Sequence, residues 1–226
     1  MPQPLRHKGA RSSGRTRGDA GATKPGGQVT AAQFEGLSKR LWDELVMLHD
    51  AWQMYSYLFG ESEERVRMLN ACAGWFFGAT QRLLLRETIL GISRLTDPLR
   101  IHGRDNLVLQ RLLLDPGLAG APETKAKLVS AIGKARKAAR KVRAHRNRYI
   151  AHLDSAYAIE PAGNPLPGLS RRSISAAIQK LEDAYSISCH GSRAFDLSPL
   201  GSADALARIL EKSERWRLIR QIKQTV

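Results

Sequence analysis

The sequence has 226 residues, which is enough to bury one good hydrophobic core, so we expect one domain with flanking tails. Lys and Arg total 36 against 21 Asp and Glu, and the formal net charge of +15 predicts attraction to polyanions. Nucleic acid is the first candidate and an anionic membrane surface is the second.

The two cysteines, Cys72 and Cys189, provide no disulfide framework and favour a reducing compartment. The N-terminus lacks the apolar core of a signal peptide, and the longest nearly apolar run, residues 71–79, is too short to span a bilayer. We therefore expect a cytoplasmic protein without a membrane partner.

Residues 1–30 are rich in Gly, Pro, Ser, Arg and Lys and show no apolar periodicity, which predicts a disordered basic leader. The leader is either an RNA-clinging arm or only a solubilising segment. We expect a helical bundle over 31–188 and a C-terminal extension with one helix over 189–226.

Two helices are predicted first in the chain. Thr30 caps the first, whose apolar face repeats at spacings of three and four and which Gly60 ends. The second runs from about Ser62 to Leu95. Its middle is apolar nearly all round, so we expect it to be central in the bundle, with Gly74 and Gly78 admitting a neighbouring helix. The face of the first helix consists of Phe34, Leu37, Leu41, Leu45, Leu48 and Trp52.

Pro98 disfavours helix in the residue before it, so Asp97 is a predicted boundary. Arg94 and Asp97, three apart, are positioned for a simple surface pair. Alternatively, Asp97 reaches forward and holds Arg146 or His152 in place. A short helix around 107–114 is expected next.

The longest helix is predicted to begin after Pro122 and to continue to Asp154. The apolar face of this helix becomes polar in its last two turns, because the same spacing continues with Arg146 and Tyr149. His145 and His152 lie along one edge of that face. A buried guanidinium is several kcal/mol unfavourable unless a counter-charge or water meets it. This strip is therefore the predicted functional site. The apolar part of the face is Leu128, Ile132, Ala135, Ala139 and Val142.

Between Lys134 and Arg148 lie eight Lys or Arg residues and no acid, so the charges along the helix repel one another. A bound phosphate chain would relieve that repulsion, and we favour a polyanion track over a merely solvated face.

Residues 155–169 are expected to form a loop, and Ser170 to cap a helix whose apolar face is Ile174, Ile178, Leu181 and Tyr185. A last amphipathic helix is predicted from Ser202. Cys189 and His190 have no second ligand pair at suitable spacing, so we expect no metal site, and no nucleotide-binding motif indicates a cofactor.

The string Arg146-Asn147-Arg148-Tyr149-Ile150-Ala151-His152 resembles the signature of the HEPN superfamily of RNases. The longer RNRYIAHLD, together with Ser93–Pro98, resembles the abortive-infection AbiU-type branch over about residues 34–187. The resemblance implies an all-α, up-and-down helical bundle with a long central helix pair, to which the sequence adds a C-terminal helix.

RNA carries its own nucleophile, the 2′-hydroxyl, and its cleavage requires a base, an acid and positive charge for the phosphorane. In this interpretation His152 is the acid/base, Arg146 clamps the phosphate, and Asn147 orients the histidine or the phosphate. No metal is required. The residues expected to contact RNA are Lys141, Arg143, His145, Arg148 and Tyr149, with Asp97 in support.

Arg146 and His152 lie about 120° apart on an ideal helix, so one helix does not gather the site, whereas a symmetric pair of helices does. The resemblance likewise implies a homodimer with a composite site, a role as a toxin or in phage defence, and an antitoxin as a possible partner. Two alternatives stay open: a non-catalytic RNA-binding or toxin–antitoxin bundle, and a helical DNA-binding protein, for which no compact helix-turn-helix is found.

Overall fold

The computed structural model describes residues 29–151, 155–160, 162–165, 168–188 and 205–212. The fold is an all-α helical bundle, as predicted, whose one small sheet pairs β1 (Arg100–Ile101) with β2 (Arg104–Asp105). The basic leader expected over 1–30 lies almost entirely outside the described residues.

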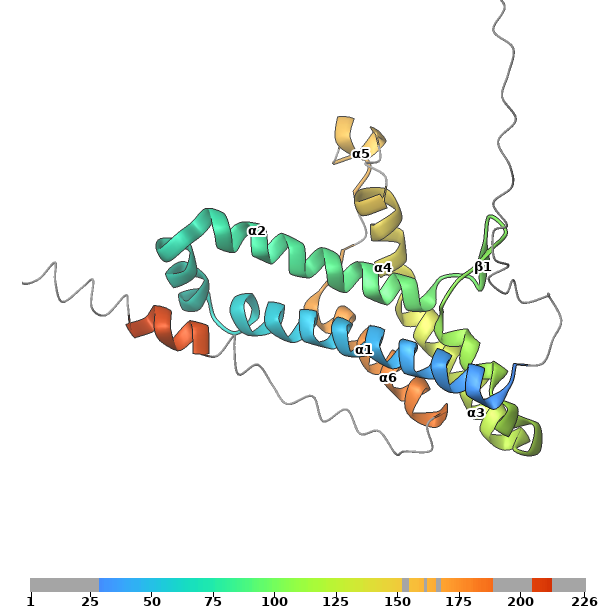
Figure 1. The fold of residues 1–226 in the computed structure, drawn as a ribbon. Coiled ribbons are helices and arrows are strands. Elements are labelled where there is room, and N and C mark those ends of the chain that lie inside the picture. The colour runs from blue at the N-terminus through green and yellow to red at the C-terminus, as the bar shows by residue number, and fades with distance from the viewer. Residues whose placement is uncertain (1–28, 152–154, 161, 166–167, 189–204, 213–226) are drawn as a thin grey trace, which may run out of the picture.

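Two long helices, α1 (Ala31–Gly60) and α2 (Glu63–Thr96), form an antiparallel hairpin (Figure 1). The predicted cap of α1 is confirmed, because Thr30 and Gln33 form a reciprocal capping box. Ser62 caps α2 by accepting a hydrogen bond from the backbone N–H of Arg65. Both predicted helix starts are therefore correct within a residue or two.

The second half of the bundle begins with two short 3-10 helices, Leu109–Leu114 and Pro116–Gly120, and continues with α3 (Pro122–Ala138) and α4 (Arg140–His145). A π-helix over Arg146–Ala151 follows. The remaining helices are α5 (Ser155–Ile159), α6 (Arg171–Ser188), which packs along α3, and residues 205–212.

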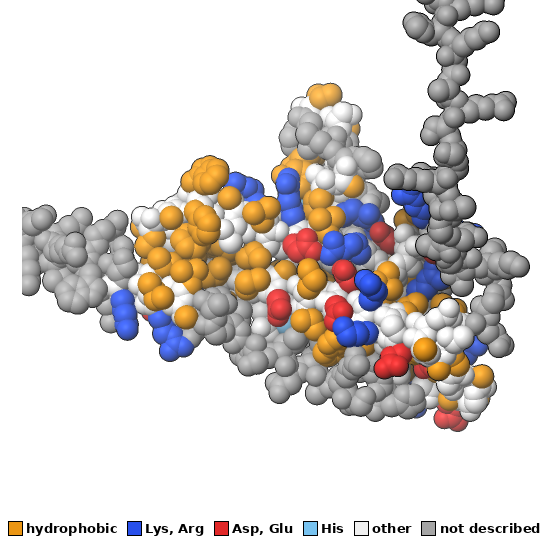
Figure 2. All heavy atoms as spheres, viewed as in Figure 1, with side chains coloured by type: hydrophobic (Ala, Val, Ile, Leu, Met, Phe, Trp, Pro, Cys, Tyr) orange, Lys and Arg blue, Asp and Glu red, His pale blue; other side chains and the backbone are white. Residues whose placement is uncertain are grey.

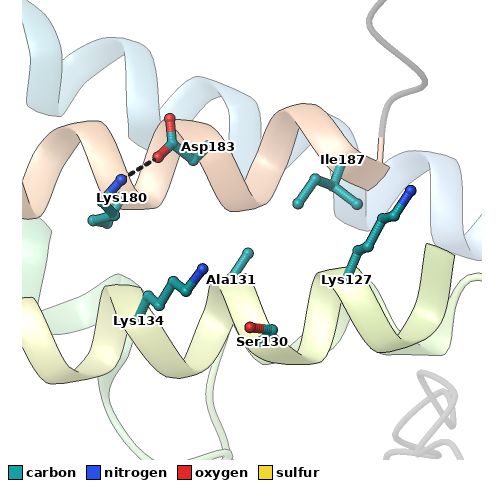
Figure 3. Close-up of a pocket in the computed structure, with 7 residues that line it drawn as sticks. All are labelled: Lys127, Ser130, Ala131, Lys134, Lys180, Asp183 and Ile187. Atoms are coloured by element: carbon teal, nitrogen blue, oxygen red, sulfur yellow. Dashed lines mark hydrogen bonds and ion pairs between the residues drawn. The ribbon is translucent and has the colours of Figure 1, made fainter. Parts of the chain in front are cut away.

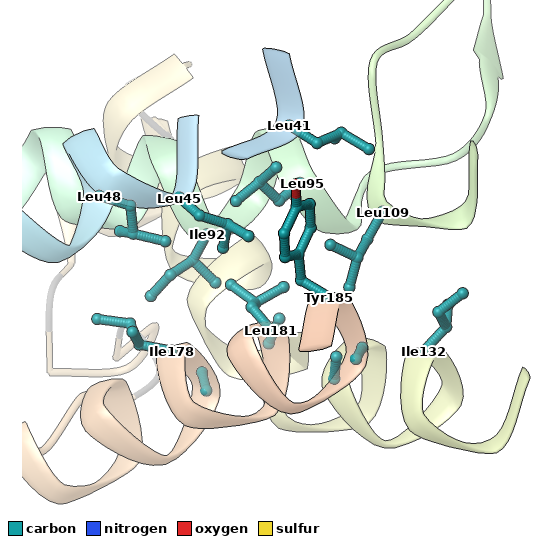
Figure 4. Packing of buried hydrophobic residues seen from close by; sticks show 14 of the residues in the cluster. Leu41, Leu45, Leu48, Ile92, Leu95, Leu109, Ile132, Ile178, Leu181 and Tyr185 are labelled. Atoms are coloured by element: carbon teal, nitrogen blue, oxygen red, sulfur yellow. The ribbon is translucent and has the colours of Figure 1, made fainter. Parts of the chain in front are cut away.

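The main core lies where α3 and α6 meet the α1–α2 hairpin (Figure 4). Tyr185 is fully buried at its centre, and its hydroxyl donates to the backbone oxygen of Ser38 at 3.0 Å. The predicted apolar faces of α1, α3 and α6 point into this core. The largest aliphatic side chains that fill it are Leu41, Leu45, Leu48, Ile92, Leu95, Leu128 and Leu181.

The expectation that the middle of α2 is central in the bundle is wrong. Trp75 is 85% exposed and Phe76 57% exposed, while Phe77 joins a small separate cluster with Leu58 and Leu69. The reason is tertiary: this end of α2 extends beyond α3 and α6 and is paired with α1 (Figure 1). The backbone of α2 also leaves helical geometry at Ala73, with φ −160° and ψ 66°.

The expected role of Gly74 and Gly78 is also not seen among the described residues, since no neighbouring backbone approaches either one. The close contact occurs at Gly91 instead, where an added Cβ would lie 3.2 Å from Leu48 Cδ1. Gly91 thus lets α2 pack closely against Leu48 of α1.

The predicted longest helix is divided. The chain bends at Ala139 (ψ −4°), so α3 and α4 are separate segments, and α2, with 34 residues, is longer than either. The break falls inside the run of like charges, where no opposite-charge pair supports the helix. The expected loop at 155–169 likewise contains the short helix α5.

Candidate functional site

The candidate site lies where the C-terminus of α2 meets α4 and the π-helix. Arg143 Nη1 donates to the backbone oxygen of Thr96 at 3.2 Å, and Arg146 Nη2 donates to Asp97 Oδ1 at 2.5 Å. Carbonyls in the last turn of a helix have no intrahelical partner, so Thr96 is a ready acceptor. The basic segment Lys134–Arg148 is called the basic rod below, and two of its arginines are therefore fixed by the end of α2.

The predicted surface pair between Arg94 and Asp97 is not formed. Arg94 pairs with Glu87 at 2.7 Å and with Glu44 at 3.3 Å, both at the surface of the α1–α2 hairpin. Asp97 instead holds Arg146, as the alternative predicted. The extended backbone of Asp97, which Pro98 imposes, ends α2 at this carboxylate.

Both side chains are largely buried: 21% of the Arg146 side chain and 13% of the Asp97 side chain are exposed. Within the described part of the chain, the Nε of Arg146 is buried and makes no hydrogen bond. An orphaned buried donor is unfavourable by about 1–3 kcal/mol, and an acceptor in the site would remove that penalty. The guanidinium is thus held on one edge and unsatisfied on another.

Positive charge exceeds negative charge around this pair. Burial lowers the pKa of Arg143, and the positive charges of Arg136 and Arg146 act in the same direction, whereas Asp97 raises it. An arginine stays protonated at neutral pH in spite of such a shift. The cluster therefore carries one carboxylate against three guanidinium groups.

The π-helix changes which side chain of the strip faces the core. In the expected α-helical series, Tyr149 follows Arg146 on the same face. In the structure, Ile150 packs against the core and Tyr149 is 36% exposed. A π-turn inserts one extra residue, and such turns are frequent at functional sites. Tyr149 is displaced to the surface as a result.

Tyr149 belongs to a small aromatic cluster. Its ring meets that of His145 edge-on at 5.6 Å and that of Tyr157 at 6.1 Å between centroids. The guanidinium carbon of Arg86 lies 6.0 Å from the Tyr149 centroid, at the limit of a cation–π contact. Sequence reasoning missed Arg86 and Tyr157, because nothing in their spacing connects α2 or α5 to the strip.

The other predicted residues are placed less closely together. Arg148 donates to the backbone oxygens of Asn164 and Pro165, at 3.1 and 3.0 Å. Asn147 and Lys141 are exposed. His152 lies outside the described residues, so its position relative to Arg146 stays a prediction.

Among the described residues, no group of three or more His, Cys, Asp or Glu side chains is arranged to hold a metal ion. In the same part of the chain, every helix is too short or too polar to cross a bilayer.

The all-α bundle and the Arg146-to-His152 motif at the end of its basic rod are the features expected of a HEPN-type protein. A comparison with known families is more specific, because residues 31–207 match the model of the family described as AbiU2. Since this span covers more than half of the sequence, the chain belongs to the AbiU2 family of HEPN-type abortive-infection proteins. No curated protein and no solved structure gave a significant match.

Proposed function

We propose that this chain is a metal-independent endoribonuclease that acts in phage defence or as a toxin, with its site at Arg146, Asn147 and His152. The observation that carries the proposal is the state of Arg146, which Asp97 anchors and whose Nε is buried without a partner. A guanidinium presented in this way suits the non-bridging oxygens of a phosphodiester.

The reaction needs no group beyond the chain and the RNA. A base removes the proton of the 2′-hydroxyl, the 2′-oxygen bonds to phosphorus, and the bond from phosphorus to the 5′-oxygen breaks as an acid protonates that oxygen. His152 takes the role of base or acid. Arg146 neutralises the charge that grows on the phosphorane, and the exposed Asn147 orients the phosphate.

A second copy of the chain would complete this site. An apolar strip on α2, made of Trp75, Phe76 and Leu83, is exposed in the part of the chain that the structure describes, and Figure 2 shows hydrophobic side chains gathered at this end of the molecule. Exposed aromatic patches of this kind mark protein–protein contacts. We propose that α2 of a second copy covers the strip.

The same strip leads toward the candidate site. Arg86, whose guanidinium lies near Tyr149, is three residues after Leu83 and about 15 Å of helix from Phe76. We propose that the contact between the copies continues along α2 to Arg86, so that the two basic strips lie near the two-fold axis of the dimer. Each copy then supplies part of a composite site, which one helix does not gather by itself.

The decisive assay incubates purified protein with RNA in EDTA and compares wild type with Arg146→Ala and His152→Ala. We expect wild type to cleave and both variants to lose at least about a hundredfold in rate while RNA binding is retained. The control variant is Arg104→Ala, which removes one positive charge at an exposed position of the β-hairpin and should cleave like wild type. Absence of cleavage by wild type would refute the enzyme.

The second candidate function is a non-catalytic RNA-binding or toxin–antitoxin protein. It is favoured by the ion pair itself, because Asp97 already neutralises much of the charge of Arg146. Such a protein would bind RNA or an antitoxin with the same surface. Equal RNA binding by wild type and His152→Ala, with no product from either, would support it.

A further inference from the structure

We propose that the groove between α3 and α6 is a second RNA site, which holds the sugar–phosphate backbone and guides a strand to the candidate site. The groove has a volume of about 350 Å³ and is lined by Lys127, Ser130 and Lys134 of α3 and by Lys180 and Asp183 of α6 (Figure 3). The proposal rests on the proposed function for the fate of the RNA, whereas binding in the groove is independent of cleavage.

The charge of the groove selects the ligand. Its lining has three lysines and one acid, and Lys180 donates to Asp183 at 2.7 Å. The pKa of Asp183 lies below its usual value, chiefly because of that hydrogen bond, and the charge of Lys134 acts in the same direction. Asp183 is therefore ionised at neutral pH and offsets one lysine.

The other two lysines of the lining form no ion pair among the described residues. Both Lys127 and Lys134 extend from α3 beside the groove (Figure 3). The two positive charges repel each other, and phosphate groups bound between them would replace this repulsion with attraction. A polyanion is thus the ligand class that the groove fits.

The spacing of the basic residues points from the groove to the site. Lys127, Lys134, Lys141 and Arg148 follow one another at intervals of seven residues. Within α3, seven residues are nearly two helical turns, so Lys127 and Lys134 lie on one face of the helix about 10.5 Å apart along its axis. Lys141 follows in α4, beyond the bend at Ala139, and Arg148 in the π-helix, so basic residues continue along the chain from the groove toward Arg146.

The dependence of RNA binding on RNA length distinguishes this groove from the candidate site. We would measure binding of single-stranded RNAs of about 6 and about 30 nucleotides by fluorescence anisotropy over a salt series, using full-length protein that carries His152→Ala to prevent cleavage. The test variant is Lys127→Gln/Lys134→Gln. Its matched control is Lys39→Gln/Lys125→Gln, which removes the same charge from exposed positions away from the groove.

We expect the test variant to bind the long RNA roughly tenfold more weakly and its salt slope to fall by about 1.4, since each lost phosphate contact on a single strand contributes about 0.7. The short RNA and the control should be unaffected. Asp183→Asn should bind the long RNA more tightly than the parent, because it removes the one acid of the lining. Thermal unfolding of each variant checks that the fold is intact.

The proposal is overturned if the test variant binds the long RNA with unchanged affinity and slope, or if the control loses as much. Loss of binding to anionic lipid vesicles with unchanged RNA binding would assign the groove to a membrane surface instead. If wild type cleaves no RNA but the lysines govern binding, the proposed function fails and the groove stands. If wild type cleaves RNA and the two lysine substitutions do not change binding, the proposed function stands and the groove proposal fails.

Discussion

Arg146 Nη2 and Asp97 Oδ1 lie 2.5 Å apart across 49 positions of sequence. The contact joins the end of α2 to the first residue of the π-helix, and both side chains are mostly buried. It fixes the orientation of the guanidinium before any substrate arrives. Preorganised charge of this kind is what stabilises a transition state without reorganisation.

The first prediction is that Asp97→Asn destabilises the fold by about 1–3 kcal/mol, because it leaves the charge of Arg146 unpaired in a largely buried position. Urea denaturation followed by circular dichroism measures the change. The double variant Asp97→Asn/Arg146→Gln should recover part of the loss, since it removes both charges.

Asp43→Asn is the control for this pair, because Asp43 and its partner Lys39 are both more than half exposed. We expect a change within about 0.5 kcal/mol for it. If Asp97→Asn is equally mild, Asp97 does not hold Arg146 in solution.

The second prediction concerns the aromatic cluster at the site. Tyr149→Ala should weaken RNA binding by about 1–3 kcal/mol, because its exposed ring offers a stacking surface for a base, whereas Tyr149→Phe should bind like wild type. Tyr157→Ala tests whether the neighbouring ring positions Tyr149 and should have a smaller effect. Anisotropy with a short oligonucleotide is the measurement.

The third prediction follows from the exposed strip on α2. Trp75→Glu/Leu83→Glu should convert a dimer into a monomer, because two carboxylates would be buried against a second copy. Analytical ultracentrifugation reports the oligomeric state. If the active site is composite, this variant should also lose cleavage, although it retains Arg146, Asn147 and His152.

The control for the strip is Val129→Glu, which places a carboxylate on an apolar side chain that is 51% exposed on α3. It should leave the oligomeric state unchanged. A wild-type monomer at micromolar concentration would contradict the assignment of the α2 strip to a second copy.

The fourth prediction concerns the core. Tyr185→Phe should lower the free energy of unfolding by about 1 kcal/mol, since it removes the hydroxyl that donates to Ser38 and leaves that carbonyl without this partner. Tyr185→Ala should lower it by about 3–5 kcal/mol, because a fully buried ring is lost. Denaturant midpoints of the two variants give the comparison.

The helices themselves could be predicted from local sequence. The capping residues Thr30, Ser62 and Ser170 determine where α1, α2 and α6 begin, and the three-and-four spacing of apolar residues determines which face α1 and α6 bury. Such signals act within one or two turns, so they need no knowledge of the rest of the chain.

The tertiary structure decided what those signals could not. The apolar segment around Trp75 is exposed because, within the described ranges, α3 and α6 do not extend over that end of α2, and composition does not record the relative lengths of packed helices. The register change that exposes Tyr149 and buries Ile150 arises from a π-turn, for which the sequence has no simple code.

The sequence by itself determined which residues compose the candidate site and the chemistry proposed for it: a basic rod that ends in an arginine, an asparagine and a histidine at a spacing that resembles the HEPN signature. The tertiary structure decided which groups that chemistry meets. Asp97, Arg86 and Tyr157 come to the strip from other helices, and contacts between segments so far apart depend on how the helices pack rather than on any spacing along the chain.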